Sequence, residues 1–459
     1  MTLARALVEA SAAMASAPMP AQARHAALLH LRDAVGVGLA AAGSPVGRPY
    51  QVLAARQTSR GAATMFGLST GAEPEMAALI NGGLIHSLEY DDTHTASIVH
   101  GSSLAAAVSL AMAEDRDLSG ADLIGAFARC WEIMIRIGLA TPGGFQQRGF
   151  HITSVAGTLA GALIAAEMLD LSHDERVAAI GIALSQAAGV FEFLSNGAAS
   201  KSLHPGWGAH AGILAAKLAA AGLTGPETAL EGRWGLFPHF AGDAAAPAAF
   251  AALLGDLGQR WHIGEAAFKL SPCCHFLHPF LEAAGLAAAA GYTPDRIARL
   301  LCRVPRGAAP IICEPWPDKQ RPATGHAMRW SLPATVAARL VENEITLSTF
   351  ERAPSPAVLD LARRIAWEPL EPSAFPTRFE AEIVVEGTDG SRETISIADA
   401  YGNASRPAGQ RELDAKFTTN AARVLSADAV AALQSALDGL ADAPRLAPLS
   451  SAIRQTRQG

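Results

Sequence analysis

The sequence has few of the features that mark secreted, membrane-spanning or disulfide-stabilised proteins. It contains only five cysteines in 459 residues, and this odd, sparse set predicts free thiols in a reducing compartment. The longest apolar run, Val155 to Ala166, is too short to span a bilayer. Glu9 interrupts the N-terminal apolar run, which therefore predicts an amphipathic helix rather than a signal peptide. We expect a soluble cytoplasmic protein with no membrane partner.

Charged and aromatic residues are also scarce. They make up 17% and 6% of the chain, and the formal net charge is −7. No basic run and no nucleic-acid-binding motif occurs, so a nucleic-acid partner is not expected. The glycine patterns that bind nucleotide phosphates are absent as well. Half of the residues are apolar, which is enough for a large core divided among two or three domains.

Helical periodicity extends through residues 1–266, with turns at Gly, Pro, Ser and Asp. No stretch there alternates with period two over any length, so we expect an all-helical domain. Residues 64–67 are either a short strand or coil. The expected helices are Leu3–Met14, Ala21–Ala42, Val46–Thr58, Pro74–Tyr90, Ser103–Glu114, Gly120–Gly138, Thr153–Leu169, His173–Gly189 and Trp207–Ala221.

The pattern changes in residues 267–405, where a β-hairpin is predicted around Gly387-Thr388-Asp389-Gly390. The expected strands are Arg299–Val304, Arg364–Trp367, Arg378–Val385 and Glu393–Ile397, and the expected helices are Phe280–Ala290 and Leu332–Glu342. Helical periodicity returns in residues 406–459, at Leu413–Phe417 and Ala427–Leu440. The predicted fold class is mainly α, with a large, discontinuous all-helical domain and an inserted smaller α+β domain.

The most polar stretch of this apolar chain is Asn81 to Ser103. A helix that unravels after Tyr90 would place four of its residues on one face, at i, i+3, i+4 and i+7. These residues are His86, Glu89, Tyr90 and Thr93, and the loop beyond them carries Asp91, Asp92, His94 and His100. The next helix is expected to begin near Ser102 or Ser103. The stretch predicts a site, and the alternative interpretation is a capped helix end.

Two further polar clusters lie at predicted helix starts. His151 precedes a helix N-terminus, whose dipole lowers the proton affinity of an imidazole and favours a neutral base. Lys201 and His204 form a cationic corner that suits a carboxylate or a phosphate. The alternatives are a packing histidine and a solvated loop lysine.

A fourth cluster, Lys269 to His278, lies where the helical part meets the α+β part. Adjacent Cys273 and Cys274 suit neither a zinc site nor a nucleophile, and no second cysteine pair completes a zinc site. We therefore regard Lys269, His275 and His278 as the candidates, and a packed domain junction without chemistry as the alternative.

Several motifs closely resemble those of the MmgE/PrpD family, in the same order and over nearly the whole chain. They are Asn81-Gly82, Glu89 to His94, His100-Gly101, Gly149-Phe150-His151, Lys201 to Gly206, Lys269 to His278, Gly325 to Val336, Gly402 and Arg406-Pro407. Members of that family include 2-methylcitrate dehydratase, cis-aconitate decarboxylase and iminodisuccinate epimerase. Three positions depart from the family pattern: Glu89 replaces Asp, Gly101 replaces Pro, and Cys274 stands at a histidine of the decarboxylases.

The resemblance implies a helical domain with an α+β lid domain, a homodimer, and no metal or organic cofactor. It places the catalytic positions at Glu89, Thr93, His100, His151, Lys201 and Lys269. We add Asp92, His94, His204, His275 and His278 as substrate-binding candidates. The Ala/Leu faces of helices such as Thr153–Leu169 also favour contact with a second subunit.

The implied activity is a cofactor-independent lyase, a dehydratase or a decarboxylase, that acts on a small di- or tricarboxylic acid. In that interpretation His151 and His100 are the acid/base pair, the two lysines neutralise carboxylates, and Glu89 and Thr93 orient the others. The alternatives are an epimerase with the same pocket, a non-catalytic helical binding protein, and a metal-dependent lyase or hydrolase. The last would use His86, Glu89, Asp92, His94 and His100. The chain has neither His-Glu-x-x-His nor Glu-x-x-His, so no metal is expected.

Overall fold

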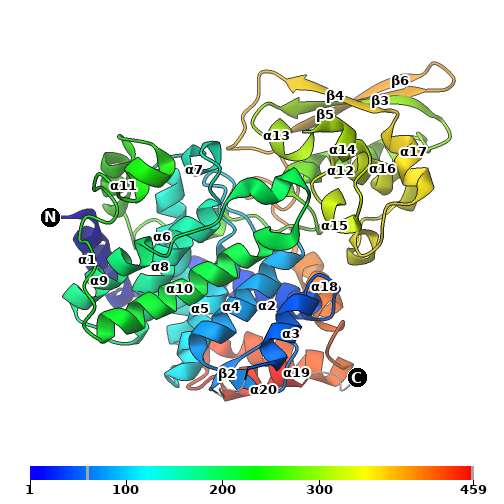
Figure 1. Cartoon of the computed structure of the whole chain (residues 1–459). Helices are drawn as coiled ribbons and strands as arrows, with labels where there is room; N and C mark the ends of the chain where they lie inside the picture. The colour runs from blue at the N-terminus through cyan, green and yellow to red at the C-terminus, as the bar shows by residue number, and fades with distance from the viewer. Residues whose placement is uncertain (58–60, 456–459) are drawn as a thin grey trace.

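The structure, a computed structural model, describes residues 1–57 and 61–455, and it is mainly helical as expected. Its buried apolar side chains form two large cores. One is built mainly from residues 4–266 together with residues 417–453, and the other from residues 273–397. Figure 1 shows the helical part at the lower left and the sheet-containing part at the upper right. On this division we propose the domain boundaries at residues 266 and 405.

Two helices at the centre of the helical part, α4 (Pro74–Ser87) and α10 (Leu203–Ala220), cross at a pair of glycines. A Cβ atom on Gly206 would lie 2.3 Å from the carbonyl oxygen of Leu79, and one on Gly82 would lie 2.8 Å from the Cα atom of Gly206. The helices therefore approach so closely that only hydrogen fits between their backbones.

The other long helices of this part surround that crossing. They are α1 (Leu3–Ser16), α2 (Ala21–Ala42), α3 (Arg48–Ala55), α5 (Gly101–Asp115), α6 (Gly120–Leu139), α8 (Ile152–Met168), α9 (His173–Leu184) and α11 (Ala246–Leu254). A short antiparallel pair, β1 (Ala63–Thr64) and β2 (Gly71–Ala72), lies at its edge. Among the described residues, no helix is both long enough and apolar enough to cross a membrane.

The second part is a four-stranded sheet with helices packed against it. The strand order is β4-β3-β5-β6, where β4 (Ile365–Leu370) is parallel to β3 (Ile297–Pro305) and the remaining pairs are antiparallel. The predicted hairpin joins β5 (Ala381–Gly387) to β6 (Arg392–Ile397), with Gly390 in the left-handed region. Helix α12 (His278–Ala289) packs against β5 and β6, and α16 (Leu332–Glu342) packs against α12. The shorter helices of this part are α13 (Ala309–Ile312), α14 (Trp316–Gln320), α15 (Gly325–Met328) and α17 (Pro356–Ala362).

The chain returns to the helical part after the sheet. Helix α18 (Gln410–Ala421) packs against α2, where the ring of Phe417 lies over Gly36. The Lys416 ammonium forms a buried ion pair with Asp33 Oδ1 at 2.8 Å. Helices α19 (Ala427–Asp438) and α20 (Ala447–Arg454) follow and complete the first core (Figure 1).

Some predicted element boundaries differ from those observed. The helix expected to reach Tyr90 ends at Ser87, because Glu89 adopts the left-handed conformation with φ +52°. The helix expected to reach Gly189 ends at Leu184. The helix expected from Ser102 or Ser103 begins at Gly101, and its N-cap is His100. The end predicted at Thr58 lies outside the described residues.

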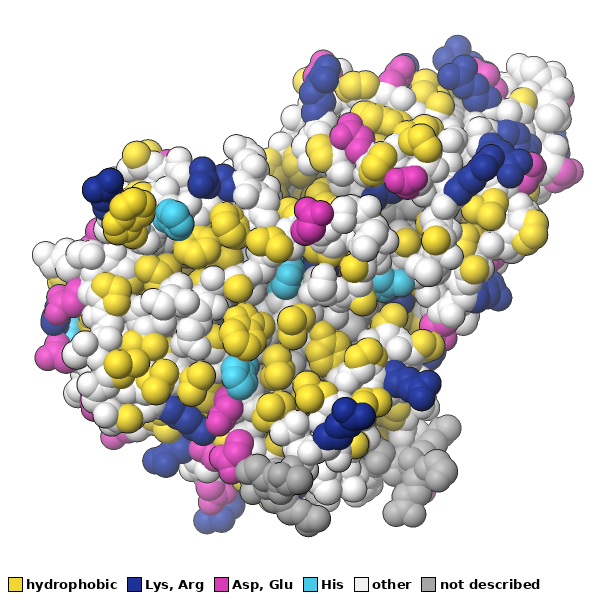
Figure 2. All heavy atoms as spheres, in the orientation of Figure 1, with side chains coloured by type: hydrophobic (Ala, Val, Ile, Leu, Met, Phe, Trp, Pro, Cys, Tyr) yellow, Lys and Arg dark blue, Asp and Glu magenta, His cyan; other side chains and the backbone are white. Residues whose placement is uncertain are grey.

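Hydrophobic side chains are spread over the face of the helical part around α4 and α10 in Figure 2. In the same view Lys and Arg side chains gather toward the outer end of the sheet part. The apolar face of Thr153–Leu169 was predicted to favour contact with a second subunit. This prediction is wrong for that helix, because α8 is buried almost completely inside the first core. Exposed large apolar side chains occur instead on α3, at Val52 and Leu53, and at Leu203 at the start of α10.

Candidate active site

A cavity of about 560 Å³ lies between the two parts of the molecule and is lined by residues of both. One end is polar, and we call it the polar end. It is formed by Glu89, Thr93, His100, His151 and Lys201. Residues predicted from separate polar clusters of the sequence are thus brought into one cavity.

Glu89 is the charged centre of the polar end. The Lys201 ammonium donates a hydrogen bond to its Oε1 atom at 2.6 Å, and Lys269 Nζ lies 3.8 Å from its Oε2 atom. Burial would raise the pKa of the Glu89 carboxyl, but the two lysines outweigh burial and hold that pKa well below its usual value. Glu89 is therefore ionised at neutral pH.

His100 is held in one tautomer by its neighbours. Its Nδ1 atom lies 3.0 Å from the carbonyl oxygen of Asp92 and 2.9 Å from Thr93 Oγ1. Because a carbonyl only accepts hydrogen bonds, Nδ1 carries the proton and Nε2 is left with a lone pair. Burial, with Lys269 and Lys201 nearby, lowers the pKa of His100 well below its usual value, so the ring is neutral.

His151 lies at the start of α8, as predicted, and is itself the N-cap of a helix that was expected to begin at Thr153. Its ring centroid lies 5.9 Å from that of His100. Its Nδ1 atom lies 3.1 Å from Nδ1 of His204, so one imidazole donates to the other. Burial, followed by the nearby His204 and Lys201, lowers the pKa of His151 well below its usual value. Burial likewise lowers the pKa of His204 to about 3. His151 can therefore hold either neutral tautomer, whereas His100 is held in one.

Lys269 lies behind Glu89 rather than on the cavity surface. Its ammonium is fully buried and makes no hydrogen bond to the described residues, and its nearest carboxylate oxygens are those of Glu89 and Asp91, the latter at 4.0 Å. The segment is positioned by the Phe268 amide, which donates to the carbonyl of Gly402. A Cβ atom on Gly402 would lie 2.2 Å from the carbonyl oxygen of Phe268, so this contact requires glycine.

Four of the five substrate-binding candidates do not line the cavity. Asp92 is buried between His30 Nδ1, at 2.6 Å, and the hydroxyl of Ser102. His204 lies behind two lining residues, His151 and Phe193, and its ring centroid is 6.1 Å from that of Phe193. The ring of His278 packs against His275, with the centroids 4.8 Å apart. Of the five candidates, His275 alone lines the cavity, next to Cys274.

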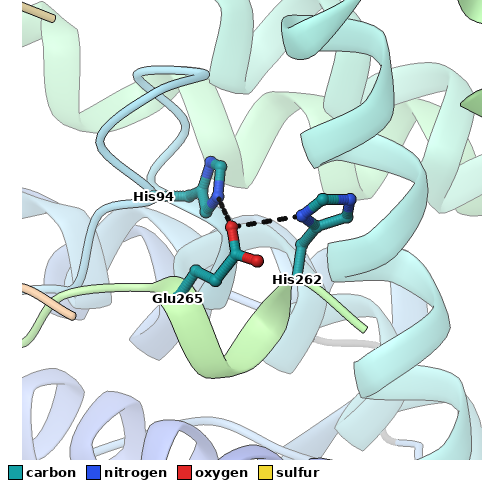
Figure 3. Close-up of side chains that lie close together, drawn as sticks. All are labelled: His94, His262 and Glu265. Atoms are coloured by element: carbon teal, nitrogen blue, oxygen red, sulfur yellow. Dashed lines mark hydrogen bonds and ion pairs between the residues drawn. The ribbon is translucent and has the colours of Figure 1, made fainter. Parts of the chain in front are cut away.

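His94, another substrate-binding candidate, belongs to a separate cluster (Figure 3). Its Nε2 atom lies 3.6 Å from Glu265 Oε2, and His262 Nδ1 lies 3.2 Å from the same oxygen. In the described part of the chain this is the group of three side chains whose ligand atoms are close enough for a metal ion. None of the three lines the cavity. The alternative metal-dependent interpretation used His86, Glu89, Asp92, His94 and His100, and among the described residues these five do not form such a group.

The sequence did not predict most of the rest of the cavity, which is mainly apolar, with Gln146, Gln147 and His275 as its other polar side chains. We call its apolar part the apolar wall: Phe191, Phe193 and Leu194 from the helical part, and Phe276, Ile311 and Phe375 from the other part. These residues lie on short 3-10 turns, on a four-residue helix and in loops, where no periodicity marks them. Two lining residues do lie in the quoted motifs: Phe276, and Trp330, whose ring lies 5.7 Å from Lys201 Nζ.

His86 was placed on the polar helix face by the sequence but was not among the catalytic or substrate-binding candidates, and it lies beside the site. Its Nδ1 atom lies 2.7 Å from Asp91 Oδ2, and its ring packs against those of both His100 and His151, at centroid distances of 5.1 and 5.5 Å. The sequence signal for this placement was the i, i+3 spacing of His86 and Glu89, which puts both side chains on one helix face.

Comparisons with known proteins agree with these motifs. The family model of the MmgE/PrpD N-terminal domain matches residues 5–249, and that of the MmgE/PrpD C-terminal domain matches residues 271–441. The chain is 29% identical over 429 residues to a cis-aconitate decarboxylase of Mus musculus, with 89% of this chain and 85% of the relative covered. It is 30% identical over 398 residues to a cis-aconitate decarboxylase of Homo sapiens, with coverages of 83% and 79%. A cis-aconitate decarboxylase of Aspergillus terreus is 27% identical over 416 residues, with coverages of 85% and 83%.

Proposed function

Because this chain belongs to the MmgE/PrpD family, we propose that it is a cofactor-independent lyase for a small di- or tricarboxylic acid of the aconitate type. The observation that carries the proposal is the polar end. It joins one carboxylate, one lysine and two neutral imidazoles in a cavity large enough for an organic acid, and a second lysine, Lys269, lies behind the carboxylate. Such a set suits proton transfer next to a carboxylate.

We assign proton transfer to His151. When its Nδ1–H donates to His204, its Nε2 atom is a base that can remove a proton alpha to a substrate carboxylate. In dehydration, the resulting imidazolium is hydrogen-bonded to His204 and gives the proton to the leaving hydroxyl. In decarboxylation no alpha proton is removed, so His151 takes a proton from solvent and gives it to the carbanion left by loss of CO₂. His151 therefore serves both dehydration and decarboxylation, and His100 is the second candidate for the base.

The lysines supply the positive charge that both reactions need. Removal of an alpha proton and loss of CO₂ both give an enolate-like species, whose negative charge lies on a carboxylate. Lys201 lines the cavity and binds that carboxylate, while Lys269 supports Glu89 from behind. Thr93 holds the ring of His100 at 2.9 Å, and His100 Nε2 accepts a hydrogen bond from a substrate hydroxyl.

The proposal is tested by incubating the purified protein with the tricarboxylic acids cis-aconitate, citrate and 2-methylcitrate, and with dicarboxylic 2-alkylmalates, in deuterated buffer and following the acids by NMR. We expect loss of water or CO₂ from at least one acid, and we expect this turnover to survive exhaustive chelation. If the folded protein leaves every acid in the panel unchanged, the lyase proposal fails.

Epimerisation of a related dicarboxylate is the second candidate function. Two neutral imidazoles, His100 and His151, lie 5.9 Å apart in one cavity and present two positions for taking and returning a proton. The same NMR experiment separates the two reactions, since an epimerase exchanges the alpha proton for deuterium without loss of water or CO₂.

A further inference from the structure

The apolar wall begins directly beside the groups proposed to react. The Phe191 ring centroid lies 5.8 Å from that of His151, and Phe193 continues the wall 5.7 Å beyond Phe191. Phe193 in turn lies 6.0 Å from Trp330, whose ring faces Lys201. A substituent on an acid bound at the polar end is therefore placed against aromatic rings rather than in water.

The opposite side of the cavity is apolar as well. The rings of Phe276 and Phe375 meet edge to face at a centroid distance of 5.1 Å. A Cβ atom on Gly307 would lie 2.5 Å from Cε1 of Phe375. Because glycine has no side chain, the Phe375 ring packs directly against the backbone at this position. Phe276, Ile311 and Phe375 are only half-buried, which leaves apolar surface open to the cavity. Covering such surface is favourable by about 25 cal/mol per Å².

Positive charge is limited in this cavity. Among the described residues that line the cavity, Lys201 is the one lysine and there is no arginine. The Lys201 ammonium is already paired with the Glu89 carboxylate, at 2.6 Å. His100 and His151 add no charge, because burial keeps both rings neutral. An acid with three carboxylates would find little compensation beyond the polar end.

Resting on the lyase function proposed above, we propose that the substrate is a dicarboxylic acid that carries an apolar substituent. The carboxylates bind at the polar end, and the substituent, an alkyl chain of several carbons or an aryl group, lies along the apolar wall. The cavity of about 560 Å³ is within the range of sites that hold drug-sized ligands, so it has room for such a substituent.

The test measures binding of succinate and of 2-methyl-, 2-butyl-, 2-octyl- and 2-phenylsuccinate to the full chain by calorimetry. We expect affinity to rise about fourfold for each methylene that the wall buries, and phenylsuccinate to bind more tightly than methylsuccinate. Ile311→Asn and Leu194→Asn place an amide in the two sides of the wall. Each should reduce the gain in affinity per methylene, and should weaken the binding of octylsuccinate by a larger factor than the binding of succinate.

Leu286→Asn is the matched control, because Leu286 is 49% exposed on α12 and does not line the cavity. If succinate binds and the longer acids bind equally or more weakly, the substituent proposal is overturned and the lyase proposal stands. A gain with chain length that both wall variants retain also overturns it, because the chain then lies elsewhere. If no acid of the series binds to the folded protein, the substituent proposal is overturned, and the NMR turnover experiment decides the lyase proposal separately.

Discussion

At the scale of single residues, His151 and His204 form the pair on which the proposed chemistry depends. Their Nδ1 atoms share one hydrogen bond. Burial lowers the pKa of both rings, so each is a neutral imidazole at neutral pH. The proton between them decides whether His151 faces the cavity with an N–H group or with a lone pair. In the proposed chemistry, His151 can therefore both take a proton from the substrate and give one to it.

We predict that His151→Ala lowers kcat by about 10²–10⁴ with a modest effect on substrate affinity, because general acid/base assistance is removed. Exchange of the substrate's alpha proton with deuterated solvent, followed by NMR, should disappear in the variant. His25→Ala, at an exposed position of α2, is the control. Exchange that continues at the wild-type rate while turnover falls would transfer the role of base to His100.

Lys201→Ala is expected to weaken both substrate affinity and turnover, since the same charge binds the ground-state carboxylate and the developing enolate. It should also lower the free energy of unfolding at pH 7 by about 3 kcal/mol, because Glu89 loses its nearest buried cation. Urea unfolding measures this loss. Adding Glu89→Gln should restore part of the stability but not the activity, and an unchanged stability of the single variant would contradict the pairing.

At the scale of elements, the α4–α10 crossing holds the polar end together. The end of α4 leads to Glu89, and α10 begins directly after Lys201, so their ion pair spans the two helices. Gly82 and Gly206 set the distance between the helices. Close packing far from the cavity surface thus controls a distance within the site.

Gly206→Ala should therefore destabilise the protein by about 1–3 kcal/mol and lower turnover as well, because the added methyl group pushes α10 away from α4. Thermal unfolding and the lyase assay measure the two effects. Gly264→Ala is the matched control, since a Cβ atom there meets nothing within 4 Å. Normal activity in a destabilised Gly206→Ala protein would show that the crossing does not position the site.

The sequence predicted these elements better than it predicted the cavity. The apolar periodicity marked the helices and the hairpin, and the polar clusters at helix ends marked Glu89, His100, His151 and Lys201. Asp92 and His94 could not be distinguished from them, because adjacent loop residues point in different directions and only the fold shows that Asp92 faces His30. The apolar wall joins Phe191 to Phe375, residues far apart in the chain, and no local pattern records such a contact.

At the scale of the whole molecule, buried histidines make stability sensitive to acid. Burial lowers the pKa of a set of rings in the folded state, to about 4 for His326 and about 3 for His278. The others whose pKa burial lowers are His94, His100, His151, His204 and His275. Their folded pKa lies below the unfolded value of about 6.5, so below that pH the unfolded chain binds more protons.

We predict that the free energy of unfolding falls as pH decreases from about 7 to about 5.5. Each such histidine contributes up to about 1.4 kcal/mol per pH unit once the unfolded chain is protonated. Buried Asp33, Glu114 and Glu132, whose pKa burial raises, bind protons in the folded state and offset part of this loss. Urea titrations at several pH values test the sign, and the slope should be shallower in His151→Ala. A stability that rises with acid would contradict the prediction.

We also propose a homodimer that uses the exposed apolar residues of α3 and the start of α10. Light scattering at micromolar concentration should give the mass of a dimer. Val52→Asp and Leu53→Asp should shift it toward a monomer, whereas Leu286→Asp should not. A monomer mass for the unchanged protein would rule out this assembly under those conditions.

The division of the cavity between two cores has a consequence for how such a protein can change over evolution. The polar end belongs entirely to the helical part, whereas Phe276, Ile311 and Phe375 belong to the other. On the proposed function, mutations in the sheet-containing part can therefore select a new acid without altering the residues to which we assign proton transfer. The same separation gives protein engineers a place to build libraries: the three wall positions of the second part can be randomised while the helical part is left unchanged.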